Sequence, residues 1–158
     1  MTDKITPCLW FDTEGEDAAK FYTSIFPNSK INEVGRYGEA GPREAGTVMA
    51  VTFTLDGREF MALNGGPQFP HTEAVSFQIS CGGQEEVDYY WDALAAGGEP
   101  GPCGWLKDRF GVSWQVVPRR MIELISDPDG ERSQRAFTAM MGMGKLDIAA
   151  AESAAEGN

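Results

Sequence analysis

The segment CGWLKDRFGVSWQVVP, residues 103–118, predicts two short extended stretches joined at a glycine. Over residues 112–116 apolar side chains alternate with small or polar ones, which is typical of a strand with one face on a core. Gln115 then falls on the opposite face. A neutral amide at that position is a candidate for contact with a ligand.

The same pattern occurs once earlier in the chain. Gly57 and Phe60 have the same spacing as Gly111 and Trp114, in the closing strands of the two halves. Repetition of a structural pattern at a fixed offset indicates duplicated units. The two halves of the chain are therefore expected to share one order of elements.

The first half predicts a strand, a helix and three further strands. Residues 5–11 predict the first strand, and the following helix begins where Thr13 and Glu16 have the spacing of a capping box. Pro27 and Asn28 end this helix. Its apolar face consists of Ala18, Phe21, Tyr22 and Ile25. The later strands are expected at residues 30–38, at an edge, and at 47–55 and 58–64, joined by a hairpin turn at Asp56-Gly57.

The second half repeats this order. A strand is expected at residues 74–81, and Gly97-Gly98 ends the helix that follows it. The apolar face of that helix consists of Val87, Tyr90, Trp91 and Leu94. In the two first strands Leu9 is matched with Phe77, and Phe11 with Ile79. The sequence thus predicts an α+β fold of paired βαβββ modules, at about residues 4–66 and 72–118.

The predicted strands have two faces of different character, since successive side chains point to opposite sides. The apolar face, expected under the helices, carries Leu9, Phe11, Met49, Val51, Phe53, Leu55, Phe60, Val75, Phe77, Ile79, Val112, Trp114 and Val116. The mixed face carries Cys8, Trp10, Val48, Ala50, Thr52, Met61, Ser76, Gln78, Ser113 and Gln115. Sheets curled around a partly wet cavity explain the mixed face, because a ligand pocket has apolar walls and a few hydrogen-bonding groups. The alternative is an outer face that rests on a partner chain.

Residues 119–158 predict a C-terminal helical extension. RRMIELISD suggests a short helix or strand extension, and Asp127-Pro128 opens a helix to about residue 141. One side of that helix carries Phe137, Met140 and Met141. The last residues suggest a final helix that frays into an acidic end. The apolar side is expected to clasp the other module or a second subunit, with docking onto a different protein as the alternative.

Composition limits the partners of the chain. Its 158 residues carry a formal charge of -11, which disfavours nucleic acid and anionic membrane surfaces. No apolar run is long enough to span a membrane, and MTDKITPC lacks the order of a signal peptide. Three cysteines without CxxC spacing fit reduced thiols in the cytoplasm. A soluble cytoplasmic protein is expected.

Several segments together resemble the vicinal oxygen chelate superfamily, which holds glyoxalases, extradiol dioxygenases and antibiotic-resistance proteins. The segments are PCLWFD, FYTSIFPNSK, FMALNGGP, EEVDYYW, GPCGWLKDRFGVSWQVVP and LDIAA. Within the superfamily they resemble the PhnB-like group, whose domain is often labelled 3-demethylubiquinone-9 3-methyltransferase, over about residues 4–150. The resemblance implies paired βαβββ modules around a cavity, and homodimers are common in the superfamily.

The resemblance also implies positions for a divalent metal, which the superfamily's enzymes hold with His and Glu. Those positions fall near Thr6, Met61, Ala74 and Gln115. None of these side chains is a good ligand, since Met61 is a soft thioether and Gln115 offers only an amide oxygen. No metal and no cofactor are expected, although an atypical ion near His71 or Glu73 remains an open alternative.

The mixed face and the resemblance together give the candidate site. The expected ligand-binding residues are Trp10, Met61, Ser76, Gln78, Trp105 and Gln115. Packing alone is an alternative explanation for the two tryptophans. His71 as a ligand or base and Cys8 as a nucleophile are the catalytic candidates, against the alternatives of a solvent-exposed histidine and an inert thiol.

The function expected from these residues is the binding of a small molecule without the usual catalytic metal. A glyoxalase-type or dioxygenase-type enzyme with an unusual metal site is the first alternative, so the sequence leaves open whether a reaction is catalysed. The methyltransferase of the family label is disfavoured, because no GxGxG turn follows a strand to bind S-adenosylmethionine. The expected partners are a small-molecule ligand and a second copy of the chain.

Overall fold

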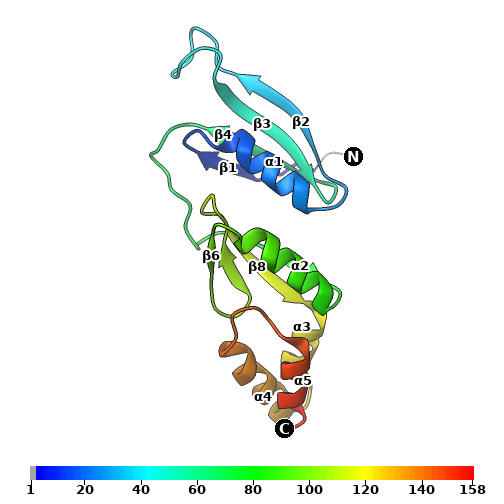
Figure 1. The fold of residues 1–158 in the computed structure, drawn as a ribbon. Helices are drawn as coiled ribbons and strands as arrows, with labels where there is room; N and C mark the ends of the chain where they lie inside the picture. Colours follow the sequence, from blue (N-terminus) through cyan, green and yellow to red (C-terminus); the bar gives the residue numbers. More distant parts are fainter. Residues whose placement is uncertain (1–2) are drawn as a thin grey trace. The chain divides into compact units, whose positions relative to one another are not determined.

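The computed structural model describes residues 3–158 and divides into two compact units (Figure 1). The first unit ends at His71 and the second runs from Thr72 to Asn158. The first contains β1 (Cys8–Phe11), α1 (Gly15–Ile25), β2 (Lys30–Arg36), β3 (Val48–Leu55) and β4 (Arg58–Asn64). The second contains β5 (Ser76–Cys81), α2 (Gln84–Ala95), β6 (Glu99–Pro100), β7 (Trp105–Lys107), β8 (Ser113–Pro118), α3 (Arg119–Ile125), α4 (Gly130–Met141) and α5 (Ile148–Ala155).

Both units have the same open-sheet topology. The strand order is β1-β4-β3-β2 in the first sheet and β5-β8-β7-β6 in the second. In each sheet the first strand of the module runs parallel to the last, and the other neighbours pair antiparallel. The predicted α+β fold of two repeated modules with C-terminal helices is confirmed.

The core of the first unit lies between α1 and one face of its sheet (Figure 1). Tyr22 stacks on Phe53 with a ring-centroid distance of 6.3 Å, and Phe53 stacks on Phe60 at 5.6 Å. Along β4 the side chains alternate regularly between buried and half-buried after the first residue. This alternation means that only one face of β4 is fully covered.

The start of α1 differs from the prediction. The Thr13/Glu16 capping box is wrong, because the N-terminal residue of the helix has no side-chain cap of its own. Instead Asn64, at the end of β4, accepts a hydrogen bond from the Gly15 N–H at 2.8 Å. A Cβ on Gly15 would lie only 2.7 Å from that amide oxygen, so glycine is required for the approach. Asn64 also donates to the carbonyls of Thr13 and Val48, both at 3.2 Å.

The hairpin between β3 and β4 is confirmed. Asp56 and Gly57 have φ values of 48° and 80°, the left-handed pair that a tight hairpin turn requires. Two residues predicted for the apolar face are exposed instead. Met49, which is 38% exposed, lies at the start of β3, and Val75, which is 67% exposed, precedes β5. The alternating pattern could not show where each strand leaves the helix that covers it.

In the second unit α2 buries the face that the sequence predicts, namely Val87, Tyr90, Trp91 and Leu94. The turn between β7 and β8 is held by a buried carboxylate. Asp108 is 3% exposed and accepts hydrogen bonds from the N–H groups of Phe110 and Val112 at 2.8 and 3.1 Å. It also accepts one from the Trp114 indole at 2.8 Å. The turn is therefore fixed from inside the module.

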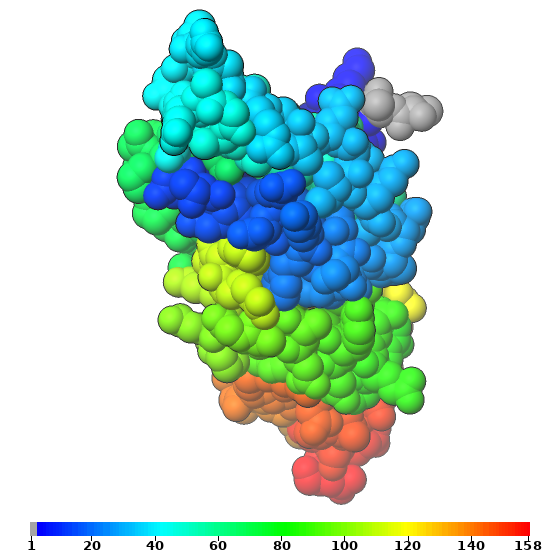
Figure 2. Space-filling model, turned by 45° about the horizontal axis from the view of Figure 1, so that its top comes forward, coloured from blue at the N-terminus to red at the C-terminus, as the bar shows by residue number. Residues whose placement is uncertain are grey.

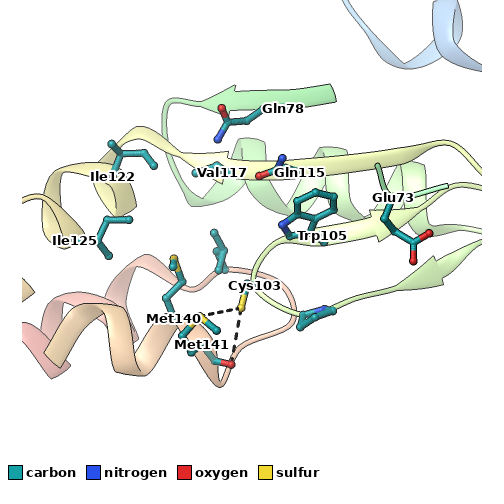
Figure 3. Close-up of a pocket in the computed structure, with 12 residues that line it drawn as sticks. Glu73, Gln78, Cys103, Trp105, Gln115, Val117, Ile122, Ile125, Met140 and Met141 are labelled. Atoms are coloured by element: carbon teal, nitrogen blue, oxygen red, sulfur yellow. Dashed lines mark hydrogen bonds between the residues drawn. The ribbon is translucent and has the colours of Figure 1, made fainter. Parts of the chain in front are cut away.

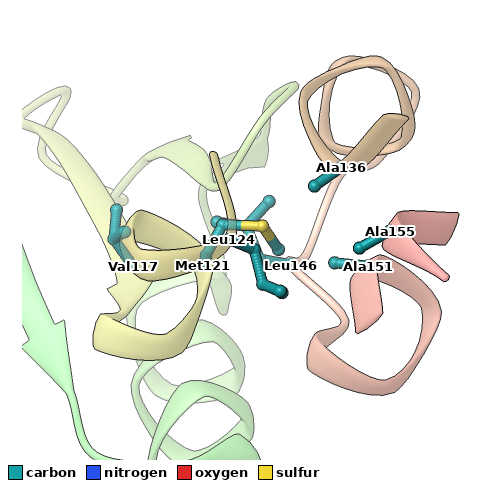
Figure 4. Packing of buried hydrophobic residues seen from close by; sticks show 7 residues of the cluster. All are labelled: Val117, Met121, Leu124, Ala136, Leu146, Ala151 and Ala155. Atoms are coloured by element: carbon teal, nitrogen blue, oxygen red, sulfur yellow. The ribbon is translucent and has the colours of Figure 1, made fainter. Parts of the chain in front are cut away.

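The C-terminal helices form a hydrophobic cluster of their own with the end of β8 (Figure 4). The buried members are Val117, Met121, Leu124, Ala136, Leu146, Ala151 and Ala155. α4 is capped by Asp129, whose side chain accepts from the N–H groups of Glu131 and Arg132, and not by Asp127 as predicted. β8 is consequently covered on both faces, with Val117 7% exposed on one and Val116 fully buried on the other.

The extension is attached to the module that it follows. The Gln84 side chain in α2 donates to the Leu146 carbonyl at 3.0 Å and accepts from the Ile148 N–H at 2.9 Å. Lys145 lies 3.3 Å from both Asp88 and Asp92. In Figure 2 the C-terminal residues, orange to red, accordingly adjoin the green surface of the second unit. Phe137 and Met141, on the apolar side of α4, are still 42% and 55% exposed, so the clasp with the other module or a second subunit stays a prediction.

Over residues 3–158, no helix has both the length and the apolar character needed to cross a membrane.

Candidate functional site

An open pocket of about 660 Å³ lies in the second unit, between the outer face of its sheet and the C-terminal helices (Figure 3). We call it the second-module pocket. The residues that line it are Glu73, Gln78, Pro102, Cys103, Trp105, Gln115, Val117, Ile122, Ile125, Met140, Met141 and Leu146. Its volume is in the range that accommodates small organic ligands, and its lining is mainly apolar.

Two amides from neighbouring strands lie on the sheet side of the pocket. Gln78 of β5 and Gln115 of β8 are paired in the parallel register, so their side chains leave the same face side by side. The Gln115 amide nitrogen donates to the Ser76 hydroxyl at 2.9 Å. This bond fixes the Gln115 side chain and leaves its oxygen as an acceptor for another group.

The turn before β7 joins the sheet side of the pocket to the C-terminal extension. Cys103 and Gly104 both have left-handed φ values, 56° and 84°. Their N–H groups donate to the carbonyls of Met143 and Gly144 at 2.7 and 2.8 Å. A Cβ on Gly104 would lie 3.0 Å from both Leu146 and the Val116 carbonyl, so a larger residue would push the two layers apart.

Sulfur and aliphatic side chains form the helical side of the pocket. Ile122 and Ile125 come from α3, and Met140 and Met141 from the end of α4 (Figure 3). The Cys103 thiol lies 3.6 Å from the Met141 sulfur and 3.8 Å from its carbonyl oxygen. Methionine side chains are flexible and polarisable, so this wall can adapt to ligands of different outline.

One charged residue reaches the rim of the pocket. The Glu73 carboxylate lies 3.0 Å from the Lys107 ammonium. The hydrogen bond from Lys107 holds the pKa of the Glu73 carboxyl below its usual value. The Glu73 carboxylate therefore stays ionised at neutral pH and is paired with Lys107.

The structure brings Ser76, Gln78, Trp105 and Gln115, four of the six predicted ligand-binding residues, to or beside this pocket. The other two belong to the first unit. The Trp10 indole donates to the Gly66 carbonyl at 2.8 Å and packs edge-on against Phe69 at 4.9 Å. Met61 is half-buried on the outer face of β4. A role for these two residues in ligand binding stays a prediction.

The two catalytic candidates also lie in the first unit. Cys8 is exposed as a residue, but its thiol is partly buried. Loss of hydration raises the pKa of the thiol, so less of the nucleophilic thiolate is present at neutral pH. The His71 ring lies 5.1 Å from that of Phe11, and its Nε2 atom is buried without a hydrogen-bond partner among the described residues. A catalytic role for either residue stays a prediction.

The positions for a divalent metal do not fit such an ion. Thr6 and Ala74 precede β1 and β5, and neither has an imidazole or carboxylate to offer. The strands pair Cys8 with Met61 and Gln78 with Gln115, which are thiol, thioether and neutral amides. Within residues 3–158 no three His, Cys, Asp or Glu side chains are grouped closely enough to hold a metal.

These pairings also revise the alignment of the two modules. The strand registers pair Cys8 with Met61 and Gln78 with Gln115, so the predicted match of Met61 with Gln115 makes Cys8 and Gln78 equivalent. The predicted match of Leu9 with Phe77 makes Cys8 and Ser76 equivalent instead. The two predicted matches therefore differ by two residues along the first strand. Such a shift keeps every side chain on the same face, so the alternating pattern could not detect it.

Sequence reasoning missed the helical wall of the pocket. The sequence showed the apolar side of α4, with Met140 and Met141, but gave no sign of which surface it would face. The folding of this segment back onto its own sheet depends on contacts between residues that are distant along the chain, such as Cys103 with Met143. No local pattern reports such contacts.

Comparison with known proteins gives a consistent result. The sequence model of the family described as 3-demethylubiquinone-9 3-methyltransferase matches residues 3–117. A PhnB protein from Bacillus cereus, whose description carries the same methyltransferase label, is 39% identical, with a TM-score of 0.66 over 73% of this chain and 99% of its own. Protein PA1353 from Pseudomonas aeruginosa is 22% identical, with a TM-score of 0.61 over 74% and 98%.

A more distant likeness concerns the fold alone. FosX, a fosfomycin resistance protein from Listeria monocytogenes solved with Mn(II) and sulfate, is 15% identical, with a TM-score of 0.52 over 75% of this chain and 90% of its own. A search of curated proteins found no match. The family match ends at residue 117, so the helical wall of the second-module pocket lies beyond it.

Proposed function

The chain belongs to the 3-demethylubiquinone-9 3-methyltransferase family, in the PhnB-like group of the vicinal oxygen chelate superfamily, and from this premise we propose that it binds a small organic molecule in the second-module pocket. The observation that carries the proposal is the composition of the pocket. Two aligned amides, Gln78 and Gln115, lie opposite a wall of methionine and isoleucine. Ligand sites combine a largely apolar lining with a few placed hydrogen-bonding groups in this way.

Gln115 orients the ligand in this proposal, and Ser76 acts through Gln115 by fixing its amide. Trp105 supplies a flat surface beside them. We propose binding and not catalysis, because the described side chains around the pocket include no nucleophile paired with a base and no set of metal donors. The family resemblance puts Gln115 near a position where the superfamily's enzymes have a glutamate, and Gln115 keeps the hydrogen-bonding shape of that residue without its charge.

A thermal-shift screen of uncharged and charged metabolites, followed by calorimetry of the hits, tests the proposal. Gln115→Ala should lower the affinity for a hit by about tenfold, because one oriented hydrogen bond is lost. Thr52→Ala, a half-buried position on the outer face of β3 in the first unit, is the matched control and should leave affinity unchanged. Equal affinity in the wild type and Gln115→Ala would refute the assigned role.

The methyltransferase label is a family name in this proposal. A methyl-donor site of the usual kind needs a doubly wound parallel sheet with a glycine-rich first turn. Each sheet of this protein has one parallel strand pair, and its other strand pairs are antiparallel. Calorimetric binding of S-adenosylmethionine by the purified protein would contradict this interpretation. A stoichiometric divalent ion in protein purified without chelator would instead favour the glyoxalase-type or dioxygenase-type enzyme.

We further propose a homodimer in the cytoplasm. All three cysteines are free, which suits a reducing compartment. Exposed apolar side chains on two neighbouring strands of the first sheet, Val34 of the edge strand β2 and Met49 of β3, offer a surface for self-association. Sedimentation equilibrium decides the oligomeric state, and a monomer at micromolar concentration would contradict the dimer.

A further inference from the structure

The charges around the second-module pocket restrict what it can bind. Among the described residues, Glu73 is the one charged member of the lining, and the Lys107 ammonium 3.0 Å away already balances that charge. Lys107 itself does not line the pocket. The described lining therefore offers no unpaired cation to an anionic ligand, and the chain as a whole carries a charge of -11.

The hydrogen-bonding groups of the pocket are also partly committed. One N–H of the Gln115 amide donates to the Ser76 hydroxyl, which leaves the second N–H as a donor and the Gln115 oxygen as an acceptor. The Cys103 thiol is directed at Met141. A ligand that satisfies the Gln115 oxygen must therefore bring an N–H or O–H donor. Gln78, beside Gln115 in the register, can complement either a donor or an acceptor.

The walls favour an apolar, flat body. Met141 is 55% exposed and Ile122 45% exposed, so both have apolar surface left to bury. Trp105, from the sheet side, presents an aromatic ring to the same space (Figure 3). Burial of this surface would supply the driving force for binding, and the paired amides would set the orientation.

We infer that the second-module pocket selects uncharged aromatic molecules that carry an N–H or O–H donor, and that it rejects carboxylates and phosphonates of the same shape. The inference rests on the proposed function and adds the ligand class. An anion entering the pocket gives up hydration and finds no counter-charge in return. An uncharged amide or phenol loses less hydration free energy than an anion on entering the pocket, and it donates a hydrogen bond to the Gln115 oxygen.

Three probes built on one naphthalene ring system test the selectivity by calorimetry on the full chain. They are 2-naphthamide, its N,N-dimethyl derivative and 2-naphthoate. We expect 2-naphthamide to bind at least about tenfold more tightly than 2-naphthoate, because the carboxylate is desolvated without a partner. The dimethyl derivative should also bind more weakly than 2-naphthamide, since it has no donor for Gln115.

A variant that places a positive charge in the pocket gives a second test of the selectivity. Gln78 is exposed on β5, so Gln78→Lys places an ammonium at the pocket without disturbing the core. It should shift the affinity ratio of the two probes towards 2-naphthoate by about tenfold, whereas uncharged Gln78→Met should not. Circular dichroism confirms that each variant is folded.

The outcomes separate the inference from the function on which it rests. Equal binding of 2-naphthamide and 2-naphthoate overturns the inference and leaves small-molecule binding intact. If none of the three probes binds at millimolar concentration, the hits of the metabolite screen decide: uncharged hits support the inference and anionic hits overturn it. Absence of any hit removes the proposed function and the inference together.

Discussion

The two modules share one topology but differ in what covers the outer face of the sheet. Along β4 of the first module one face is fully buried and the other half-buried, whereas in β8 of the second the outer face is buried too, except at the half-buried Gln115. The difference comes from α3, α4 and α5, which pack on the end of β8. A duplicated fold therefore supplies the frame, and the added helices convert one of its two outer faces into a pocket.

The modules are also fixed at different points. In the first, the Asn64 amide ties the last strand to the start of α1, and in the second, the Asp108 carboxylate ties the β7–β8 turn to Trp114. Each is a buried polar side chain with three hydrogen bonds inside its own unit. Substitutions at these two residues should consequently weaken one module each.

The largest effect is expected from Asp108→Ala. It leaves two buried donors and one half-buried donor without their acceptor, and we expect the second module to lose about 4 kcal/mol of unfolding free energy. Chemical denaturation followed by the fluorescence of Trp114 and its neighbours measures the loss. A change below about 1 kcal/mol would show that the turn does not depend on this carboxylate.

A similar loss should follow when the helical cluster is opened. Met121 is fully buried in that cluster, so Met121→Ala should cost about 3 kcal/mol through the cavity that it leaves. The neighbouring Ile122, 45% exposed, is the matched control, and Ile122→Ala should cost less than about 1 kcal/mol. Equal effects of the two substitutions would mean that the helices do not form a packed layer.

Asn64→Ala should weaken the first module by about 2 kcal/mol, because it removes the cap of α1 and two further hydrogen bonds. Asn32, whose side chain donates to the Thr54 hydroxyl in an exposed hydrogen bond, is the control for the loss of an asparagine side chain. Hydrogen exchange should show faster opening of α1 in Asn64→Ala and not in Asn32→Ala. Faster exchange in α2 instead would contradict the assignment of Asn64 to the first module.

The Cys81 thiol should make the stability of the second module depend on pH, with a small change for each pH unit. Burial, and then the Glu86 carboxylate, raise the pKa of the Cys81 thiol to about 11. Below the usual thiol pKa of 9.0 both states are protonated, and above it the unfolded chain ionises first. The stability of the wild type relative to Cys81→Ala should thus fall by about 1 kcal/mol per pH unit between pH 9 and 11. A difference independent of pH would contradict the raised pKa.

The fold could be predicted from the sequence where local signals suffice. The face of α2, the Asp56-Gly57 turn and the order of strands all follow from spacing and turn chemistry. The cap of α1 could not be predicted, because its acceptor, Asn64, is far along the chain from the Gly15 N–H. The sheet side of the pocket followed from alternation, with Gln78 and Gln115 on one face. The helical side needed the three-dimensional packing of the extension.

Methyl NMR of protein labelled at the methionine methyl groups tests the central claim most directly, since methionines lie in both modules. On addition of 2-naphthamide, or of an uncharged hit from the screen, we predict that the signals of Met140 and Met141 shift while those of Met49 and Met61 stay in place. Shifts at Met61 with Met140 and Met141 unchanged would contradict a ligand site built by the C-terminal helices on the second module.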